Sequence, residues 1–438
     1  MKGNRVTRRV SRRRLMRQGA ALGGLALAAP LQACTGETLL DQETTGSGYG
    51  PLEDKGDLLL PKGFTYRVVS RQGDIMDDGN PTPGRFDGMA TFRGPDGATV
   101  VMRNHENKGE PGEVAVVVPD DERYDADSTA NGGVTKLIVA SDRSVVESRA
   151  VLGGTLNNCA GGPTPWGTWI SCEEVFFDGD EPHGYAFEVD SSATGPVPAV
   201  PIKGAGRFVH EATAWHDGIL YETEDVSDDS AFYRYLPGVA PANAGDLAAS
   251  SGRLQALSVV GAPRVSTKTG WTVGKGSSVE WVDIDDPDPG TDSVRVQARD
   301  KGAAAFDRQE GAWVGDGRIY FDCTEAGEAG CGQIWAYDPS REILTLLYES
   351  PGPEELKNPD NLVVSPMGDL FICEDSAPPP FIRGLTMSGE IYPFARANTA
   401  NSEFAGVCFD PQGKTMFVNQ QGDTGKEAAV MYAIWGPW

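Results

Sequence analysis

Histidine is scarce in this chain. The 438 residues include four histidines, at positions 105, 183, 210 and 216, and none forms an HExxH arrangement. A zinc site built from histidines is therefore not expected. The sequence also lacks a GxSxG nucleophile elbow and a Walker loop, which argues against a serine hydrolase of the α/β type and against a P-loop protein.

Long apolar runs and helical periodicity are absent after the first 33 residues. The sequence therefore shows no further candidate for a membrane span. Its 55 glycines and 30 prolines indicate many turns. The short apolar segments between those turns favour an all-β fold.

The first 33 residues have the composition of a targeting segment. They contain eight Lys or Arg, no Asp or Glu, and a short apolar run. The stretch SRRRLM, Ser11 to Met16, resembles a twin-arginine motif, so we expect residues 1–33 to be a Tat-type signal peptide read by the Tat export machinery. Cys34 ends a lipobox-like LQAC, which leaves lipid anchoring and ordinary cleavage both open. Residues 34–51 would be a linker, and the mature protein is expected in the periplasm, at the cell surface or secreted.

The net charge of the chain is −25, and removal of the basic leader makes it more negative. Nucleic acid is therefore not an expected partner. The acidic excess has two interpretations: a solvated surface, or a subset of carboxylates gathered around cations. Composition alone leaves both open.

Six similar units follow one another along the chain. Each has a polar residue seven to ten positions before a turn glycine, with a short apolar strand on either side of the turn. The glycines are Gly97, Gly167, Gly218, Gly317, Gly368 and Gly413. Repeats of this length built from short strands are typical of propeller blades. We predict an all-β, six-bladed β-propeller over residues 52–438, with an insertion near 237–300 or, alternatively, a seventh blade hidden there.

Blades of a propeller converge on a central channel, so equivalent polar residues of successive units can form a ring. Glu211 and Glu310 both lie seven residues before their glycine. Such a ring of carboxylates repels itself unless protons or cations neutralise it. The alternative is that each residue caps a turn of its own blade. The polar candidates are Asn157, Asn158, Glu173, Glu174, Glu211, Glu224, Arg308, Glu310, Asp360, Asn361, Glu374 and Asp375.

Cysteine usage separates one residue from the others. Cys172, Cys373 and Cys408 lie in apolar runs and are expected in the core, whereas Cys323 and Cys331 flank a short loop that a disulfide could close. Cys159 lies instead among amides, glycines and prolines. Oxygen ligands suit calcium and a thiolate suits a transition metal, so Cys159 beside the acidic ring indicates a mixed central-channel metal site.

Several stretches together resemble the PhoX alkaline phosphatases, over about residue 60 to the C-terminus. They are GGTLNNCAGGPTPWGTWISCEE, GRFVHEATA, RQEGA, NPDNLVVSPMGDLFICED and SEFAGVCFDPQGKTMFVN. The resemblance implies a six-bladed propeller that holds Fe3+ and Ca2+ in its channel and hydrolyses phosphate monoesters. A Tat signal is also typical of that family.

Carried over by motif, the resemblance implies Cys159 as an iron ligand and Glu174, Glu211 and Glu310 as metal ligands. It places Arg308 on the phosphate, so that Arg308 and Glu310 form the catalytic element, although the motif reads Arg-Gln-Glu here where Arg-Pro-Glu is typical. The ring argument adds further candidate metal ligands, namely Glu173, Asp360, Asn361 and Glu374.

Two other functions remain open at this point. One is a calcium-dependent propeller hydrolase of the lactonase or phosphotriesterase type, which would leave Cys159 and Arg308 as structural residues. The other is a non-catalytic envelope-binding propeller whose metals only connect the blades. We expect a monomer in each case.

Overall fold

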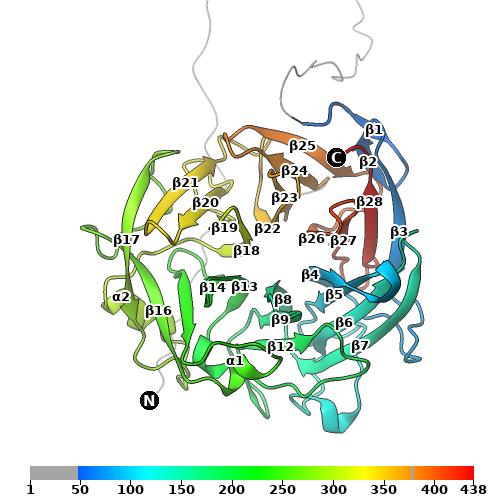
Figure 1. Ribbon diagram of the computed structural model, residues 1–438, viewed down its shortest axis with the longest axis horizontal. Helices are drawn as coiled ribbons and strands as arrows, with labels where there is room; N and C mark the ends of the chain where they lie inside the picture. The colour runs from blue at the N-terminus through cyan, green and yellow to red at the C-terminus, as the bar shows by residue number, and fades with distance from the viewer. Residues whose placement is uncertain (1–47, 376–378) are drawn as a thin grey trace, which may run out of the picture. The chain divides into compact units, whose positions relative to one another are not determined.

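The computed structural model describes residues 48–375 and 379–438, which form antiparallel sheets arranged around a central axis (Figure 1). The signal peptide, Cys34 and most of the linker predicted above lie outside the described residues. None of the helices in the described ranges is long and apolar enough to cross a membrane.

Each blade is a meander whose innermost strand faces the axis. The first blade contains β4 (Phe86–Arg93), β5 (Thr99–His105), β6 (Gly132–Val139) and β7 (Val145–Thr155). The second contains β8 (Asn158–Pro163), β9 (Thr168–Glu173) and β12 (Ala186–Asp190). The third contains β13 (His210–His216), β14 (Ile219–Glu224), β15 (Tyr233–Pro237) and β16 (Gly252–Val259).

The second half of the chain continues the pattern. The fourth blade contains β18 (Gln309–Gly315), β19 (Arg318–Cys323), β20 (Gln333–Asp338) and β21 (Ile343–Glu349). The fifth contains β22 (Pro359–Val364), β23 (Leu370–Glu374), β24 (Phe381–Leu385) and β25 (Ile391–Ala397), extended by β2 (Leu58–Pro61) and β1 (Leu52–Asp54). The sixth contains β26 (Phe404–Phe409), β27 (Met416–Gln420) and β28 (Val430–Trp435), completed by β3 (Thr65–Arg71) from the N-terminal side.

Short elements lie between these strands. They are a small hairpin of β10 (Phe177–Asp178) and β11 (Pro182–His183), the 3-10 turns η1 (Pro95–Gly97), η2 (Asp120–Glu122) and η3 (Lys203–Ala205), and the helices α1 (Asp246–Ala249) and α2 (Val294–Asp300).

The six innermost strands contact one another in a closed ring, in the order β4, β8, β13, β18, β22 and β26. Five sheets make up the six blades, because β17 (Gly276–Asp283) pairs with both β16 and β21 and joins the third and fourth blades into one nine-stranded sheet. The predicted six-bladed propeller is confirmed. The long interval near 237–300 contains the outer strand β16, the joining strand β17 and both α-helices, and no seventh blade.

The predicted hairpin glycines are also confirmed. All six adopt positive φ, from +67° at Gly413 to +101° at Gly368, and each turns between the first two strands of its blade. Glycine reaches this left-handed region without the penalty that a Cβ atom brings.

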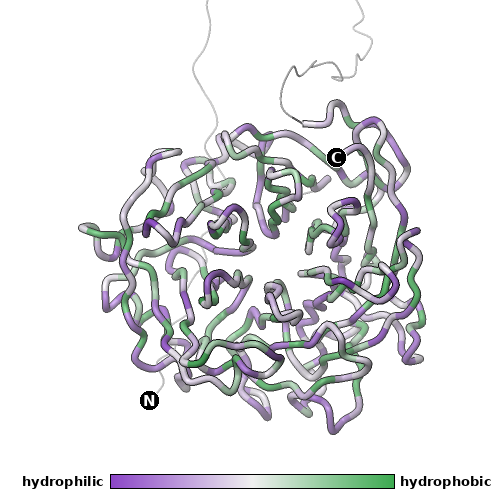
Figure 2. The backbone as a smooth tube through the Cα atoms, viewed as in Figure 1, coloured by the Kyte–Doolittle hydropathy of each residue, from purple (hydrophilic) through white to green (hydrophobic). Residues whose placement is uncertain are grey.

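The core lies between the faces of neighbouring blades. Val363 and Phe371 of the fifth blade pack with Val407 and Val418 of the sixth. Hydrophobic segments run along the strands of the blades in Figure 2. The C-terminal Trp438 packs against this core, with its ring centroid 4.8 Å from that of Phe64 and 5.2 Å from that of Phe394.

The described cysteines are all unpaired and buried. Cys172, Cys373 and Cys408 lie in three different core clusters, as predicted. The suggested disulfide between Cys323 and Cys331 is absent. Cys323 packs in the core beside Trp335 and Phe321, while the Cys331 thiol lies against the carbonyl of Ala329.

Every innermost strand carries a β-bulge at the same place. Near its start, two consecutive residues lie opposite one residue of the neighbouring strand. The second of the two is small in four blades, where it is Gly88, Ala160, Ala212 or Gly311. A Cβ atom on Gly88 would lie 2.6 Å from Cα of Ala160 in the next blade. Small side chains therefore let the innermost strands approach closely around the axis.

We expect Gly88→Ala to destabilise the fold by about 1–3 kcal/mol, because backbone atoms of the next blade would have to move. Gly290→Ala is the matched control, since its added Cβ meets nothing within 4 Å, and it should change stability by less than about 0.5 kcal/mol. Urea unfolding measures both. Equal stabilities for the two variants would contradict the close packing of the bulges.

Candidate metal centre in the propeller channel

The first residue of each bulge occupies equivalent positions around the axis. These residues are Asp87, Cys159, Glu211, Glu310 and Asp360, with Gly406 at the sixth position. The five with side chains line one pocket of about 200 Å³. At Gly406 a Cβ atom would lie 2.4 Å from the carbonyl oxygen of Asp87, so that position has no room for a side chain. A bulge re-aims a side chain, and here it brings donors from five blades to one level.

Side chains of neighbouring blades hold the bulges in place. The Asn104 amide donates to the carbonyl of Cys159 at 3.0 Å, and the Thr223 hydroxyl donates to the carbonyl of Glu310 at 2.6 Å. The Asn419 amide donates to the carbonyl of Asp87 at 2.7 Å. The backbone that positions the channel side chains is thus fixed by contacts between blades.

A second layer of polar residues follows from another repeated contact. In each blade, the N–H of the residue just after the second strand donates to the carbonyl of the residue just before the innermost strand, at 2.8 to 3.2 Å. The donor residues are Glu106, Glu174, Asp225, Thr324, Asp375 and Gln421, and the acceptors are Arg85, Asn157, Val209, Arg308, Asn358 and Glu403. Seven of these twelve residues line the same pocket, namely Arg85, Glu106, Glu174, Arg308, Asp375, Glu403 and Gln421. Lys108, which lies two residues after Glu106, lines it as well.

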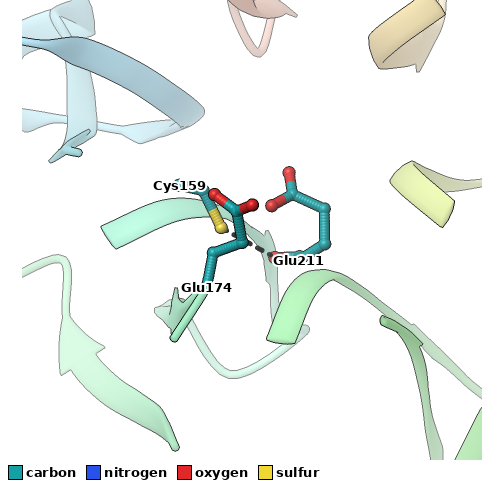
Figure 3. A group of neighbouring side chains, drawn as sticks. All are labelled: Cys159, Glu174 and Glu211. Atoms are coloured by element: carbon teal, nitrogen blue, oxygen red, sulfur yellow. Dashed lines mark hydrogen bonds between the residues drawn. The ribbon is translucent and has the colours of Figure 1, made fainter. Parts of the chain in front are cut away.

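Two clusters of possible metal ligands share one residue. Cys159, Glu174 and Glu211 each place a ligand atom within 4.8 Å of the others, and so do Glu211, Glu310 and Asp360. Figure 3 shows the Cys159 thiol and the carboxylates of Glu174 and Glu211 gathered from different strands. Glu211 therefore belongs to both a thiol-containing and an all-carboxylate cluster.

These groups repel one another when charged. Burial, reinforced by Glu174 and Asp360, raises the pKa of Glu211 well above its usual value, and burial with Asp225 raises that of Glu310. Burial and the nearby Glu211 also raise the pKa of the Cys159 thiol. One oxygen of Glu211, Oε2, is buried without a hydrogen-bond partner among the described residues. Cations would satisfy that oxygen and remove the repulsion, so the donor set fits bound metal.

The donors also indicate which metals fit. Carboxylate oxygens suit hard cations such as calcium, and a thiolate suits a transition metal. The cluster that contains Cys159 therefore fits a transition metal, and the cluster of Glu211, Glu310 and Asp360 fits an oxygen-binding cation.

Arg308 is held at the edge of this pocket. Its guanidinium donates to both oxygens of Asp225, at 3.1 and 2.9 Å, and to Glu310 at 2.9 Å. The residue adopts a left-handed φ of +49°, which is uncommon for a non-glycine residue. Asp225 thus orients the guanidinium, although Asp225 was not among the predicted site residues.

The sequence did not predict the side of the pocket that the first blade contributes. The Glu106 carboxylate binds Lys108 at 2.7 Å and Arg85 at 3.3 Å, and it accepts from the Gln421 amide at 2.7 Å. Asp87 lies beside it, and burial together with Glu106 raises the pKa of Asp87 to about 7. Glu106 follows its strand as Glu174 does, so the repeat contained the signal.

The structure does not bring Glu173, Glu374 or Asn361 to the metal clusters. Glu173 accepts from the N–H groups of Leu156 and Gly184, both at 2.9 Å. Glu374 accepts from the N–H groups of Lys357 and Phe381, both at 3.1 Å. Each is the last residue of a second strand and faces away from the channel, because successive strand residues point to opposite faces.

Asn361 is the second residue of its bulge, where four other blades have glycine or alanine. Its amide oxygen accepts from the N–H of Gly406 in the next blade. It therefore connects two innermost strands and does not join the clusters that contain Glu211.

Fold and site together define a six-bladed β-propeller whose central channel is lined by possible metal ligands. Residues 47–423 match the model of the family described as alkaline phosphatase PhoX. The chain belongs to this family and is an alkaline phosphatase, a phosphoric monoester hydrolase. The resemblance noted in the sequence is confirmed.

Solved structures show the same fold. The chain is similar to Pseudomonas fluorescens PhoX in complex with vanadate, a transition state analogue, at 18% identity and a TM-score of 0.66, covering 88% of this chain and 97% of that chain. It is more distantly similar to a Xanthomonas campestris gluconolactonase, at 11% identity and a TM-score of 0.40, covering 85% and 98% of the two chains. No curated protein matches the chain.

A buried histidine explains why Glu173 is structural. His183 contacts Glu173 at 2.7 Å and Asp125 at 3.2 Å, and none of the three side chains is exposed. Burial alone would lower the pKa of His183, but the two carboxylates hold it above its usual value. The three residues form a buried charged network between the second blade and the loop before β6.

We expect His183→Ala to cost about 3–5 kcal/mol, because it leaves two buried carboxylates without their shared partner. The raised pKa means that this contribution is complete below the ordinary histidine value of about 6.5 and is lost as pH rises through the folded-state value. The difference in free energy of unfolding between the variant and the parent should therefore narrow at alkaline pH. Urea unfolding across pH measures it, with the partly exposed His216→Ala as control, and equal losses for the two variants would contradict the network.

Proposed function

We propose that this alkaline phosphatase is an exported enzyme that uses ferric iron and calcium in its channel to release phosphate from phosphate monoesters. The observation that carries the proposal is the position of Glu211, which connects the cluster containing Cys159 to the cluster of carboxylates. A thiol and several carboxylates within one pocket support two kinds of metal side by side.

The charge of the pocket requires bound cations for this activity. A phosphate monoester is a dianion, and eight carboxylates line the channel pocket, from Asp87, Glu106, Glu174, Glu211, Glu310, Asp360, Asp375 and Glu403. Bound metals supply Lewis acidity and a local reversal of the field that would otherwise exclude the substrate. Cys159, Glu174 and Glu211 would hold iron, and Glu310 and Asp360 would hold calcium together with Glu211.

Arg308 is the residue best placed to bind the phosphate. Its planar guanidinium can meet two phosphate oxygens, and Asp225 fixes the orientation of that plane. In this role it would stabilise the charge that develops in the transition state.

The geometry favours this proposal over its alternatives. A hydrolase that uses calcium alone leaves the Cys159 thiol without a role, although it lies within 4.8 Å of two carboxylate ligands. A binding propeller with structural metals leaves no role for the orientation of Arg308 toward the pocket.

Export rests on the leader sequence. SRRRLM at residues 11–16 supports recognition by the Tat machinery, which exports folded proteins, and Cys34 supports a lipid anchor at the membrane. Cell fractionation tests this part, and enzyme that stays in the cytoplasm would contradict it.

The Cys159→Ala variant tests the iron site. If the thiolate binds ferric iron, charge transfer from sulfur to iron gives the purified parent a visible absorption band. The variant should lose that band, iron and activity. Cys172→Ala removes a thiol from the same core cluster and should lose stability by cavity formation while it keeps the band. Elemental analysis and absorption spectroscopy of the parent and both variants test this assignment. A colourless, iron-free but active parent would refute it.

The Arg308→Ala variant tests phosphate binding. It should keep its metals but lose about a hundredfold or more in kcat/KM, the usual cost of one lost charge-stabilising donor. Arg318→Ala, at an exposed position of the same blade, is the matched control and should keep full activity. Activity of the Arg308 variant within about threefold of the parent would contradict the assignment.

A further inference from the structure

A second cavity lies at the other end of the first and sixth blades. Its volume is about 370 Å³, and the turns after β4, β6 and β26 line it with Thr99, Ser141, Arg143, Asp410, Gln412 and Lys414. The channel donors lie near the starts of β4 and β26, whereas these turns follow their ends. The cavity, which we call the seam pocket, is therefore separate from the metal centre.

Arg143 brings a partly buried cation to the seam pocket. Its guanidinium carbon lies 4.0 Å from the centroid of the Trp435 ring, a cation–π contact that fixes the side chain. Its Nε is buried without a hydrogen-bond partner, and no carboxylate of the described residues lies within 4.0 Å of its nitrogens. Burial lowers its pKa, and Asp410 and Asp142, which lie beyond ion-pair distance, offset only part of that effect.

Lys414 brings a second cation from the opposite blade. Its backbone is fixed, because its N–H donates to Asp410 at 2.7 Å and its carbonyl accepts from the Trp438 indole at 2.9 Å. Its ammonium forms no ion pair with the described residues. Asp410 also lines the pocket, so the lining carries two cations and one carboxylate.

We propose that the seam pocket binds a small oxyanion of the phosphate or sulfate type, between Arg143 of the first blade and Lys414 of the sixth. The Arg143 fork suits two oxygens of such an anion. The side chains of Ser141 and Gln412 have no hydrogen bonds to described residues and supply further donors. The lining comes from the first blade and from the turn between β26 and β27 of the sixth, so the anion would connect the first and last blades of the ring.

A ligand that binds only the folded state raises the melting temperature by mass action. We therefore expect sulfate, which is not the product of the catalytic pocket, to raise the melting temperature of the holoenzyme above that in sodium chloride of equal ionic strength. The double variant Arg143→Met, Lys414→Met should lose most of this increase and keep phosphatase activity within about twofold. If the double variant does not fold, Lys414→Met alone, a substitution of an exposed side chain, tests the same anion effect.

Two controls locate the binding. Lys275→Met removes an exposed positive charge elsewhere and should leave the anion effect unchanged. Arg308→Ala should also keep it, since the seam pocket does not include the catalytic pocket. An anion effect that persists in both seam-pocket variants, or that disappears in Arg308→Ala, would overturn the proposal.

Discussion

The bulge at the start of each innermost strand is the constraint on which the site depends. It sets two residues against one and turns the first of them toward the axis. Because the bulge recurs in six strands, a single local irregularity brings Asp87, Cys159, Glu211, Glu310 and Asp360 to one level of the channel. Small residues at the second position allow the strands to approach, and hydrogen bonds from neighbouring blades fix the geometry.

That arrangement concentrates like charges where water is scarce, which opposes folding unless cations or protons are present. The raised pKa values of Glu211, Glu310 and Asp360 have this common cause, since burial comes first and mutual repulsion second. The rest of the ring must tolerate this strain in the absence of metal. Extensive cores between blades, and closure of the sixth blade by β3, supply the rigidity that holds the carboxylates together.

The sequence repeat predicted the number of blades and four of the five channel donors, because the glycine turns and the polar residues before them recur. It did not distinguish Glu173 from Glu174, since adjacent acids face opposite sides of a strand and the sequence does not mark which side faces the channel. Asp87 was missed because its hairpin includes the 3-10 turn η1, which places it ten residues before Gly97 instead of seven or eight. The channel donor always occupies the first position of the bulge, whereas its distance in sequence from the turn glycine varies between blades.

The channel is also asymmetric in the charges that its blades contribute. Blades two to five contribute the thiol and most of the carboxylates that suit metals, whereas the first blade contributes Arg85 and Lys108, both fixed by Glu106. Asp87 and Glu106 of the same blade offset these two cations. The charge of Lys108 is stabilised by Glu106 and by Glu174, which belongs to the cluster that contains Cys159, so the basic side chains of the first blade border the possible metal ligands. Glu106 also accepts from the Gln421 amide of the sixth blade, and it therefore joins the basic side chains of the first blade to the acidic ring.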